Sequence, residues 1–312
     1  MKPFLFGVML ITLSLISPPS VSATQEGKAF PEKQFDHEKD RRFIICTGSA
    51  YACASETAGS EEKCLENALA AAKRLVLRKC HAMLEGQLTN ATTPIPFEFV
   101  DIRPNEYVRV LEKKTLAPRI QGPKKSCGVQ IMAEIRYRLI HSDSSQPRKL
   151  PAGAHFPLTA RLWSDQSEYK AGEKIVFHLR GNRDFFTCII DVAPDGEMIQ
   201  LLPNLYRKYL FFKGGKDYHL PDPGLGDDFS LDVSPPFGEE HVLVYASTVP
   251  LIALTAEEYI GGFARVRQSE ESLSRELRHA LMTSSGKDIL PGAFSAAEFF
   301  ETRWTIRTHK RD

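Results

Sequence analysis

The chain has 312 residues, of which 42% are apolar and 25% are charged, an ordinary composition for a globular protein with buried cores. Its 40 basic and 39 acidic side chains nearly cancel, so no strong field attracts nucleic acid or an anionic membrane, and we expect no nucleic-acid partner. Without an N-terminal targeting segment the chain keeps roughly 290 residues, which suits two domains of about 100–200 residues each.

The first 23 residues have the pattern of a secretory signal peptide. Lys2 gives a positive start, Phe4–Ile16 is a mostly apolar run, and Val21-Ser22-Ala23 is a small-residue cleavage site. The run is shorter than the about 20 apolar residues that span a bilayer, and no cysteine follows it where a lipoprotein carries its acyl anchor. We expect cleavage after Ala23, a periplasmic or secreted chain without membrane span or lipid anchor, and a mobile leader at 24–40.

A strand and a long amphipathic helix follow the leader. Arg42–Gly48 is an apolar run of strand length. Ser60 suits the helix N-cap, Glu61 and Glu62 suit the positive end of the helix dipole, and Gly86 suits the C-cap. Apolar residues recur at spacings of three and four, which predicts one buried stripe: Leu65, Leu69, Ala72, Val76, Cys80 and Met83.

A second long strand is predicted by strict alternation from Val129 to Leu139, with the odd-numbered residues facing inward. The proline-containing region before it is expected to hold another strand around Glu106–Leu111. Together these elements predict a small α/β domain over residues 41–141, with one long helix on a sheet.

Residues 142–152 have the polar, serine- and proline-containing composition of a linker. Beyond them, short apolar or alternating runs recur about every ten residues, separated by turn residues, which is typical of an all-β sandwich or barrel. A helical pattern at Glu270–Met282 and a closing strand at Phe300–Thr308 complete an α+β protein whose second domain covers residues 153–312. The six predicted strands before that helix are Phe156–Trp163, Lys174–Leu179, Phe185–Val192, Met198–Leu202, Phe229–Val233 and His241–Ala246.

Several motifs of the second domain resemble a bacterial family of domains of unknown function, DUF4384. They are Leu162–Asp165, Tyr169–Glu173, the hairpin Ile190–Gly196 with Leu201–Asn204, and Phe237–Glu239. The resemblance covers roughly residues 157–247. It implies a β-sandwich module of an envelope or surface protein, without catalytic residues to transfer.

The first domain is similar in outline to small lipoprotein and flagellar-assembly domains of the bacterial envelope. The shared features are a strand ending in a Thr-Gly turn, here Cys46–Ala50, and an alanine-rich helix, here Leu69–Ala72.

The cysteines favour disulfides, because an oxidising compartment is expected and their irregular spacing without a CxxC pair does not suit zinc. Cys64 and Cys80 cannot pair, since they lie about 24 Å apart on one helix and a disulfide needs Cα atoms within about 7 Å. We favour Cys53 with Cys64 and leave Cys80 with Cys46 or with Cys127 open. Cys188 is expected to be a buried free thiol. The disulfide candidates are Cys46, Cys53, Cys64, Cys80 and Cys127.

Catalytic and metal sites are weakly indicated. A triad of Ser164 or Asp191 with one of the histidines lacks the Gly-x-Ser-x-Gly elbow that exposes a nucleophile. Asp191, Asp195 and Glu197 could suggest calcium, but a hairpin turn explains Pro194-Asp195-Gly196 better. We therefore expect no catalytic residue, metal or cofactor. The histidines considered are His155, His178 and His219.

An aromatic and basic segment is the candidate binding surface, although ordinary packing of an edge strand explains the same pattern. Its aromatic residues lie near Arg207, Lys208 and Lys213 and could receive a peptide or glycan. We expect a binding or scaffolding module for a protein or glycan partner in the envelope. The alternative is a periplasmic hydrolase that acts on envelope polymers. The candidate binding residues are Tyr206, Tyr209, Phe211 and Phe212.

Overall fold

The computed structural model describes residues 40–53, 60–89, 95–100, 107–121, 124–140, 156–208, 210–251, 259–285 and 294–311. The predicted signal peptide, the leader up to residue 39 and the linker at 142–152 lie outside these ranges. Within these ranges the fold is mostly β-sheet with two α-helices, α1 (Ser60–Thr89) and α2 (Glu270–Ser285), and a 3-10 turn at Pro223–Leu225. Neither helix is both long and apolar enough to cross a membrane.

Seventeen strands are present in the described residues. Twelve of them form one sheet of order β15-β16-β10-β9-β14-β17-β1-β4-β2, with β3 beside β4, β11 beside β9 and β6 beside β17. The others form the small sheets β12-β8-β5 and β13-β7. The strands are β1 (Arg41–Cys53), β2 (Phe97–Phe99), β3 (Arg109–Gln121), β4 (Lys124–Leu139), β5 (Ala160–Ser164), β6 (Glu168–Lys170), β7 (Lys174–Ile175), β8 (Phe177–Gly181), β9 (Phe185–Val192), β10 (Met198–Leu202), β11 (Phe211–Phe212), β12 (Tyr218–Leu220), β13 (Leu231–Asp232), β14 (Glu239–Ser247), β15 (Tyr259–Ile260), β16 (Phe263–Val266) and β17 (Ser295–His309).

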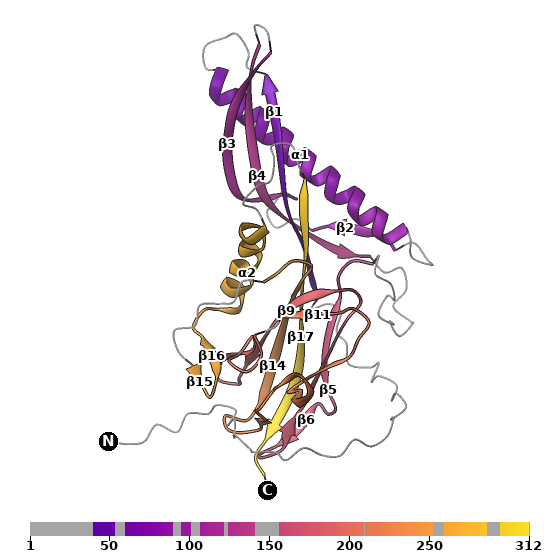
Figure 1. Ribbon diagram of the computed structural model, residues 1–312, viewed down its shortest axis with the longest axis vertical. Coiled ribbons are helices and arrows are strands. Elements are labelled where there is room, and N and C mark those ends of the chain that lie inside the picture. Colours follow the sequence, from indigo (N-terminus) through magenta and orange to yellow (C-terminus); the bar gives the residue numbers. More distant parts are fainter. Residues whose placement is uncertain are drawn as a thin grey trace, which may run out of the picture.

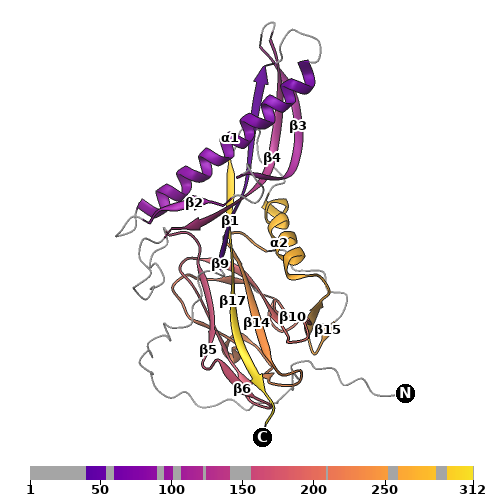
Figure 2. The same ribbon diagram turned by 180° about the vertical axis from the view of Figure 1, so that it is seen from behind.

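The last strand of the chain joins its two halves. One end of β17 pairs with β1, from Ser295 opposite Thr47 to Glu301 opposite Arg41. Its other end pairs with β14, from Phe299 to Arg307. Figures 1 and 2 show β17 running along the long axis, so the α/β part and the β-rich part share one sheet. The boundary at 142–152 stays a prediction, but the second part contributes a strand that extends into the first.

Helix α1 covers one face of β1 and β4 (Figure 1). Its buried residues recur every fourth position, whereas Leu65, Leu69 and Met83 are only half-buried. A row at this spacing advances around the helix and matches the twist of the sheet beneath it. The buried row is Cys64, Ala68, Ala72, Val76, Cys80, Leu84 and Leu88.

Two glycines have roles other than those we predicted. β1 runs straight through Gly48, where an added Cβ would lie 2.6 Å from Cγ1 of Val76, so this glycine permits close helix packing and makes no turn. Gly86 lies inside α1 rather than at its C-cap, because the helix continues to Thr89, whose hydroxyl donates to the carbonyl oxygen of Glu85.

The β-rich part buries its core between the large sheet and the small sheet β12-β8-β5, with β5 packed against β14 and β17. Phe177, Phe185, Phe212, Phe300 and Trp304 are among its buried residues.

The opposite face of the large sheet receives α2. Leu273, Leu277 and Leu281 of that helix pack against Phe43 of β1 and Phe299 of β17. This contact lies where the two parts of the sheet meet.

Candidate functional site

Strand β3 forms a long exposed edge of the sheet. It has 13 residues and pairs with β4 along one side, while none of the described strands pairs with its other side. All but one of the side chains from Glu112 to Ile120 are exposed, Leu116 being half-buried, and Ile120 is 76% exposed. We call Glu112–Ile120 the β3 edge. In Figure 1 it lies in the part of the molecule farthest from the C-terminus.

The β3 edge is basic. Lys113, Lys114 and Arg119 carry positive charge, against the single negative charge of Glu112. All four side chains are exposed. The edge therefore presents a positive surface in a chain whose total charge is close to zero.

Two register shifts limit the regular part of this edge. They lie between Val110 and Glu112 and between Leu116 and Arg119. Pro118 lies within the second shift, a position that tolerates a residue without an N–H group. Between the shifts, Glu112–Leu116 pairs residue by residue with β4. This five-residue stretch has regular strand geometry that an added strand can continue.

The distal end of the edge is held by a layered contact across three strands. An added Cβ on Gly128 of β4 would lie 2.4 Å from the ring of Tyr51, so only glycine lets this ring lie across β4. The guanidinium of Arg119 lies 3.9 Å from the centre of the same ring, in a cation–π contact. The contact fixes β3 after its second register shift.

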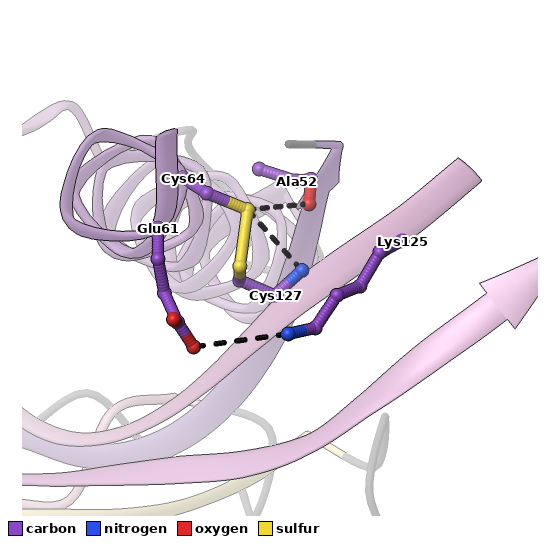
Figure 3. Close-up of a disulfide and its surroundings, with 5 residues drawn as sticks. All are labelled: Ala52, Glu61, Cys64, Lys125 and Cys127. Carbon is purple, nitrogen blue, oxygen red and sulfur yellow. Dashed lines mark hydrogen bonds and ion pairs between the residues drawn. A yellow bond between two sulfur atoms is a disulfide. The ribbon is translucent and has the colours of Figure 1, made fainter. Parts of the chain in front are cut away.

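A disulfide anchors the same end of the sheet to the helix. Cys64 of α1 is bonded to Cys127 of β4, with Cα atoms 5.8 Å apart (Figure 3). The backbone N–H of Cys127 donates to Sγ of Cys64 at 3.3 Å, and Lys125 lies 4.0 Å from Glu61. The pairing of Cys53 with Cys64 that we favoured is wrong, because β4 rather than the end of β1 brings its cysteine to the first turn of α1.

A buried ion cluster holds the base of β3 and β4 under α2. Nε of Arg278 donates to Glu134 of β4 at 2.5 Å, and Nη1 donates to Glu301 of β17 at 2.5 Å. Arg109 of β3 lies 3.5 Å from Glu134, and the hydroxyl of Ser274 donates to Glu301. The three charged residues at the centre of the cluster, Arg278, Glu134 and Glu301, are each 5% exposed or less. Burial of paired charges at this point ties α2 to three strands of the sheet.

The predicted aromatic surface is mostly packed. Phe212 is 2% exposed and packs between Phe185 and Tyr218, so it faces the core and offers no surface anchor. Tyr206 and Phe211 are half-buried, and their rings contact Phe229 and Phe186. Tyr209 lies outside the described residues. A binding role for the remaining part of this segment stays a prediction.

The residues of the hypothetical triad do not meet. Ser164 and His178 lie on different faces of the small sheet, because Trp163, not Ser164, is the register partner of His178. The hydroxyl of Ser164 donates to the carbonyl of Gln166 and accepts from the indole of Trp304. His178 instead pairs with the exposed Asp165 at 3.0 Å. His219 contacts the ring of His178, and His155 lies outside the described residues.

The predicted hairpin turn is confirmed. Asp195 accepts from the backbone N–H of Glu197, and Gly196 has a φ of +86°. Asp191 lies in the strand before the turn, where burial and the neighbouring carboxylate of Glu240 raise its pKa well above the usual range. Burial also raises the pKa of Glu240, which accepts a hydrogen bond from Thr308. No group of three or more metal-ligating side chains occurs in the part of the chain that the structure describes.

The other three described cysteines are buried. Cys46 of β1 and Cys80 of α1 are fully buried free thiols in the structure, and the thiol of Cys80 donates a hydrogen bond to Sγ of Cys46 at 3.5 Å. Cys188 is a buried free thiol, as predicted, and burial raises its pKa to about 12. Cys53 ends β1, and its side chain lies outside the described residues.

Comparison with known proteins supports one of the two resemblances. Residues 168–250, about a quarter of the chain, match the model of a family described as "Domain of unknown function (DUF4384)". The match spans β6 to β14, so it covers much of the β-rich part and neither helix α1 nor the β3 edge. No curated protein and no solved structure matches the chain. The proposed likeness of the first part to lipoprotein and flagellar-assembly domains has no support.

Proposed function

We propose that this is an exported protein of the bacterial envelope that works as a binding module, and that it captures an extended acidic segment of a protein partner along the β3 edge. The observation that carries the proposal is the long, exposed and basic edge strand. An extended peptide can add to such an edge through backbone hydrogen bonds, while side-chain contacts provide selectivity. The regular stretch Glu112–Leu116 supplies the backbone groups, and Lys113, Lys114 and Arg119 supply the charge.

The positive charge of the β3 edge favours an acidic partner over a second copy of this chain. Lysine and proline on an edge strand oppose pairing between identical edges, because like charges repel and proline removes a donor. The charge of an acidic strand is opposite in sign to that of the β3 edge. The approach of such a strand is favoured by Coulomb attraction, within a screening length of about 8 Å at physiological ionic strength. The features that protect the β3 edge from self-association therefore favour pairing with an acidic segment.

Two observations support placing this module in an oxidising compartment outside the cytoplasm. The first 23 residues have the charged start, short apolar run and small-residue site of a signal peptide. The bond between Cys64 and Cys127 is of the kind that persists in exported proteins.

Site-specific photo-crosslinking in the producing cells tests the proposal. A photoreactive residue at Thr115, in the middle of the regular stretch, should yield a discrete adduct with a partner protein. The same residue at His279, on the exposed side of α2, should not yield that adduct.

Charge reversal at two places then distinguishes binding at the β3 edge from a general effect of net charge. Lys113→Glu with Lys114→Glu should lower the adduct yield at least tenfold. The matched control reverses Arg74 and Arg78 on the exposed side of α1, which changes the net charge equally and should leave the yield unchanged. Failure to find an adduct at Thr115, or equal loss in the two charge reversals, would overturn the proposal.

A further inference from the structure

We infer that Cys46 and Cys80 are joined by a second disulfide, which an external disulfide oxidant introduces before α1 docks on the sheet. The inference depends on export to an oxidising compartment and is independent of the β3 edge. The two cysteines come from different elements, β1 and α1, and the structure brings their sulfur atoms to 3.5 Å.

The packing around this pair favours bond formation. One helical turn before Cys80, Val76 lies against Gly48, two residues along β1 from Cys46. Helix and strand therefore run past each other in register, with the glycine holding them close. A disulfide bond is about 2.05 Å long, so the two sulfurs, 3.5 Å apart, need to approach by about 1.5 Å to bond.

Every other pairing of these two cysteines is excluded by geometry. Cys64 and Cys127 are bonded to each other. Cys53 lies seven residues from Cys46 on the same strand, or about 23 Å away at about 3.3 Å per residue. Cys188 belongs to the cluster under α2, on the other face of the sheet. Cys46 and Cys80 are left with each other.

The chemistry is a pair of thiol–disulfide exchanges. The thiolate of one cysteine attacks an external disulfide, which forms a mixed disulfide and releases one thiol. The thiolate of the other then attacks the mixed disulfide, which closes the bond between Cys46 and Cys80 and releases a second thiol. The two protons end on the released thiols, and the external disulfide is the species reduced.

Burial sets the order of events. Both side chains are 0% exposed in the folded protein, so neither an oxidant nor a reductant reaches them. The hydrogen bond from Cys80 and then burial raise the pKa of the Cys46 thiol, which disfavours the reactive thiolate after docking. The bond therefore forms while α1 is still apart from the sheet, and docking then protects it.

With both disulfides, helix α1 is covalently linked to the sheet at two points. Cys64 attaches the first turn of α1 to β4, and Cys80, about 24 Å further along the helix, attaches it to β1. The two closed loops, 46–80 and 64–127, interleave in sequence. Neither strand can leave the helix while both bonds are intact.

Counting free thiols in the exported full-length protein tests the inference, because replacing Cys80 changes the count in opposite directions with and without the second disulfide. The protein is denatured without reductant, and its thiols are alkylated and counted by mass. If Cys46 and Cys80 are bonded, Cys80→Ser releases the thiol of Cys46 and raises the count by one. If they are free, the same change lowers the count by one. The matched control Cys188→Ser should lower the count by one in either case.

Peptide mapping of the wild-type protein makes the result independent of how the variants fold. Digestion without reduction should give one peptide pair linked through Cys46 and Cys80. Chain that is folded under reducing conditions and then exposed to oxidised glutathione should keep both thiols. A count lowered by Cys80→Ser, or the lack of the linked peptide pair, would refute the second disulfide. Rapid oxidation of the folded reduced chain would refute the order of events.

Discussion

Replacing Arg278 with methionine should be among the most destabilising single changes in this protein. The side chain is 5% exposed and lies between two buried carboxylates, Glu134 and Glu301, at 2.5 Å from each. Its guanidinium also lies 4.1 Å from the centre of the Phe43 ring. Methionine keeps most of the apolar packing and removes the charge, so two carboxylates lose their main partner.

The size of the loss in stability depends on the charged groups that still contact the two carboxylates after Arg278 is replaced. Removing one partner of a buried ion pair costs about 3–5 kcal/mol, because the other charge stays buried and uncompensated. Here Arg109 lies 3.5 Å from Glu134 and Arg41 lies 3.6 Å from Glu301, and both continue to offset part of that charge. We therefore expect the lower end of the range, about 3 kcal/mol, which is about a hundredfold in the unfolding equilibrium.

Urea unfolding followed by far-ultraviolet circular dichroism measures this loss as a lower midpoint. The matched control is Arg275→Met on the same helix, whose exposed pair with Glu271 contributes at most about 0.5 kcal/mol. Adding Glu134→Gln to Arg278→Met should recover at least about 1 kcal/mol, because one of the uncompensated charges is gone. If Arg278→Met matches the control, or the second change adds to the loss, the reasoning about buried charge is wrong.

Three further predictions concern separate parts of the molecule. Replacing Cys64 and Cys127 with alanine should cost about 4 kcal/mol in urea unfolding, the loop-closure value for a separation of 63 residues, and an unchanged midpoint would contradict a disulfide role in stability. The raised pKa of Asp191 means that the folded state holds a proton that the unfolded chain releases, so this stability is present below the unfolded pKa of about 3.9 and is lost as the pH rises. Asp191→Asn should therefore flatten the fall in stability as the pH rises above about 4, and a profile parallel to wild type would contradict it. Phe212→Ala should cost about 3–5 kcal/mol and Phe211→Ala clearly less, as measured by urea midpoints, with equal losses arguing against the different burial of the two rings.

Local periodicity was sufficient to predict several of the long elements of this fold. The helix from Ser60, the alternating strand that ends at Leu139 and the hairpin at Pro194-Asp195-Gly196 each depend on contacts close in sequence, and all three are present. The closing strand was also identified, but β17 begins at Ser295, five residues before the predicted start. These additional residues make most of the pairing with β1, which continues to Glu301. Pairing between strands about 250 residues apart leaves no periodic signal within either strand.

The inward and outward faces of β4 show where alternation fails. Its odd-numbered residues face α1 as predicted, but Met132 and Glu134 on the other face are also buried. A strand that is buried on both faces has the alternating sequence of a half-exposed strand when a polar residue on one face pairs with a polar residue of the element that covers it. Arg278 of α2 is that partner, and the helix that carries it follows β4 by more than a hundred residues.

The β3 edge was underestimated for a related reason. We expected a strand only around Glu106–Leu111, whereas β3 continues to Gln121. Charged residues and Pro118 interrupt any apolar alternation in this stretch, since an edge strand facing solvent needs no apolar face. The pair Gly122-Pro123, a typical turn dipeptide before the long strand, was the available signal for a hairpin.

The two fastenings of the β3–β4 pair explain how an exposed edge can serve as a docking strand. A peptide that adds to an edge gives up about 1–2 kcal/mol of backbone entropy for each residue that becomes fixed, and a mobile edge would add a similar cost on its own side. Here the edge is held at both ends of the regular stretch Glu112–Leu116. The disulfide of Cys127 and the stack of Arg119 on Tyr51 hold the distal end, and Arg109 with Glu134 holds the base. In the proposed docking, the ordering cost therefore falls mainly on the partner.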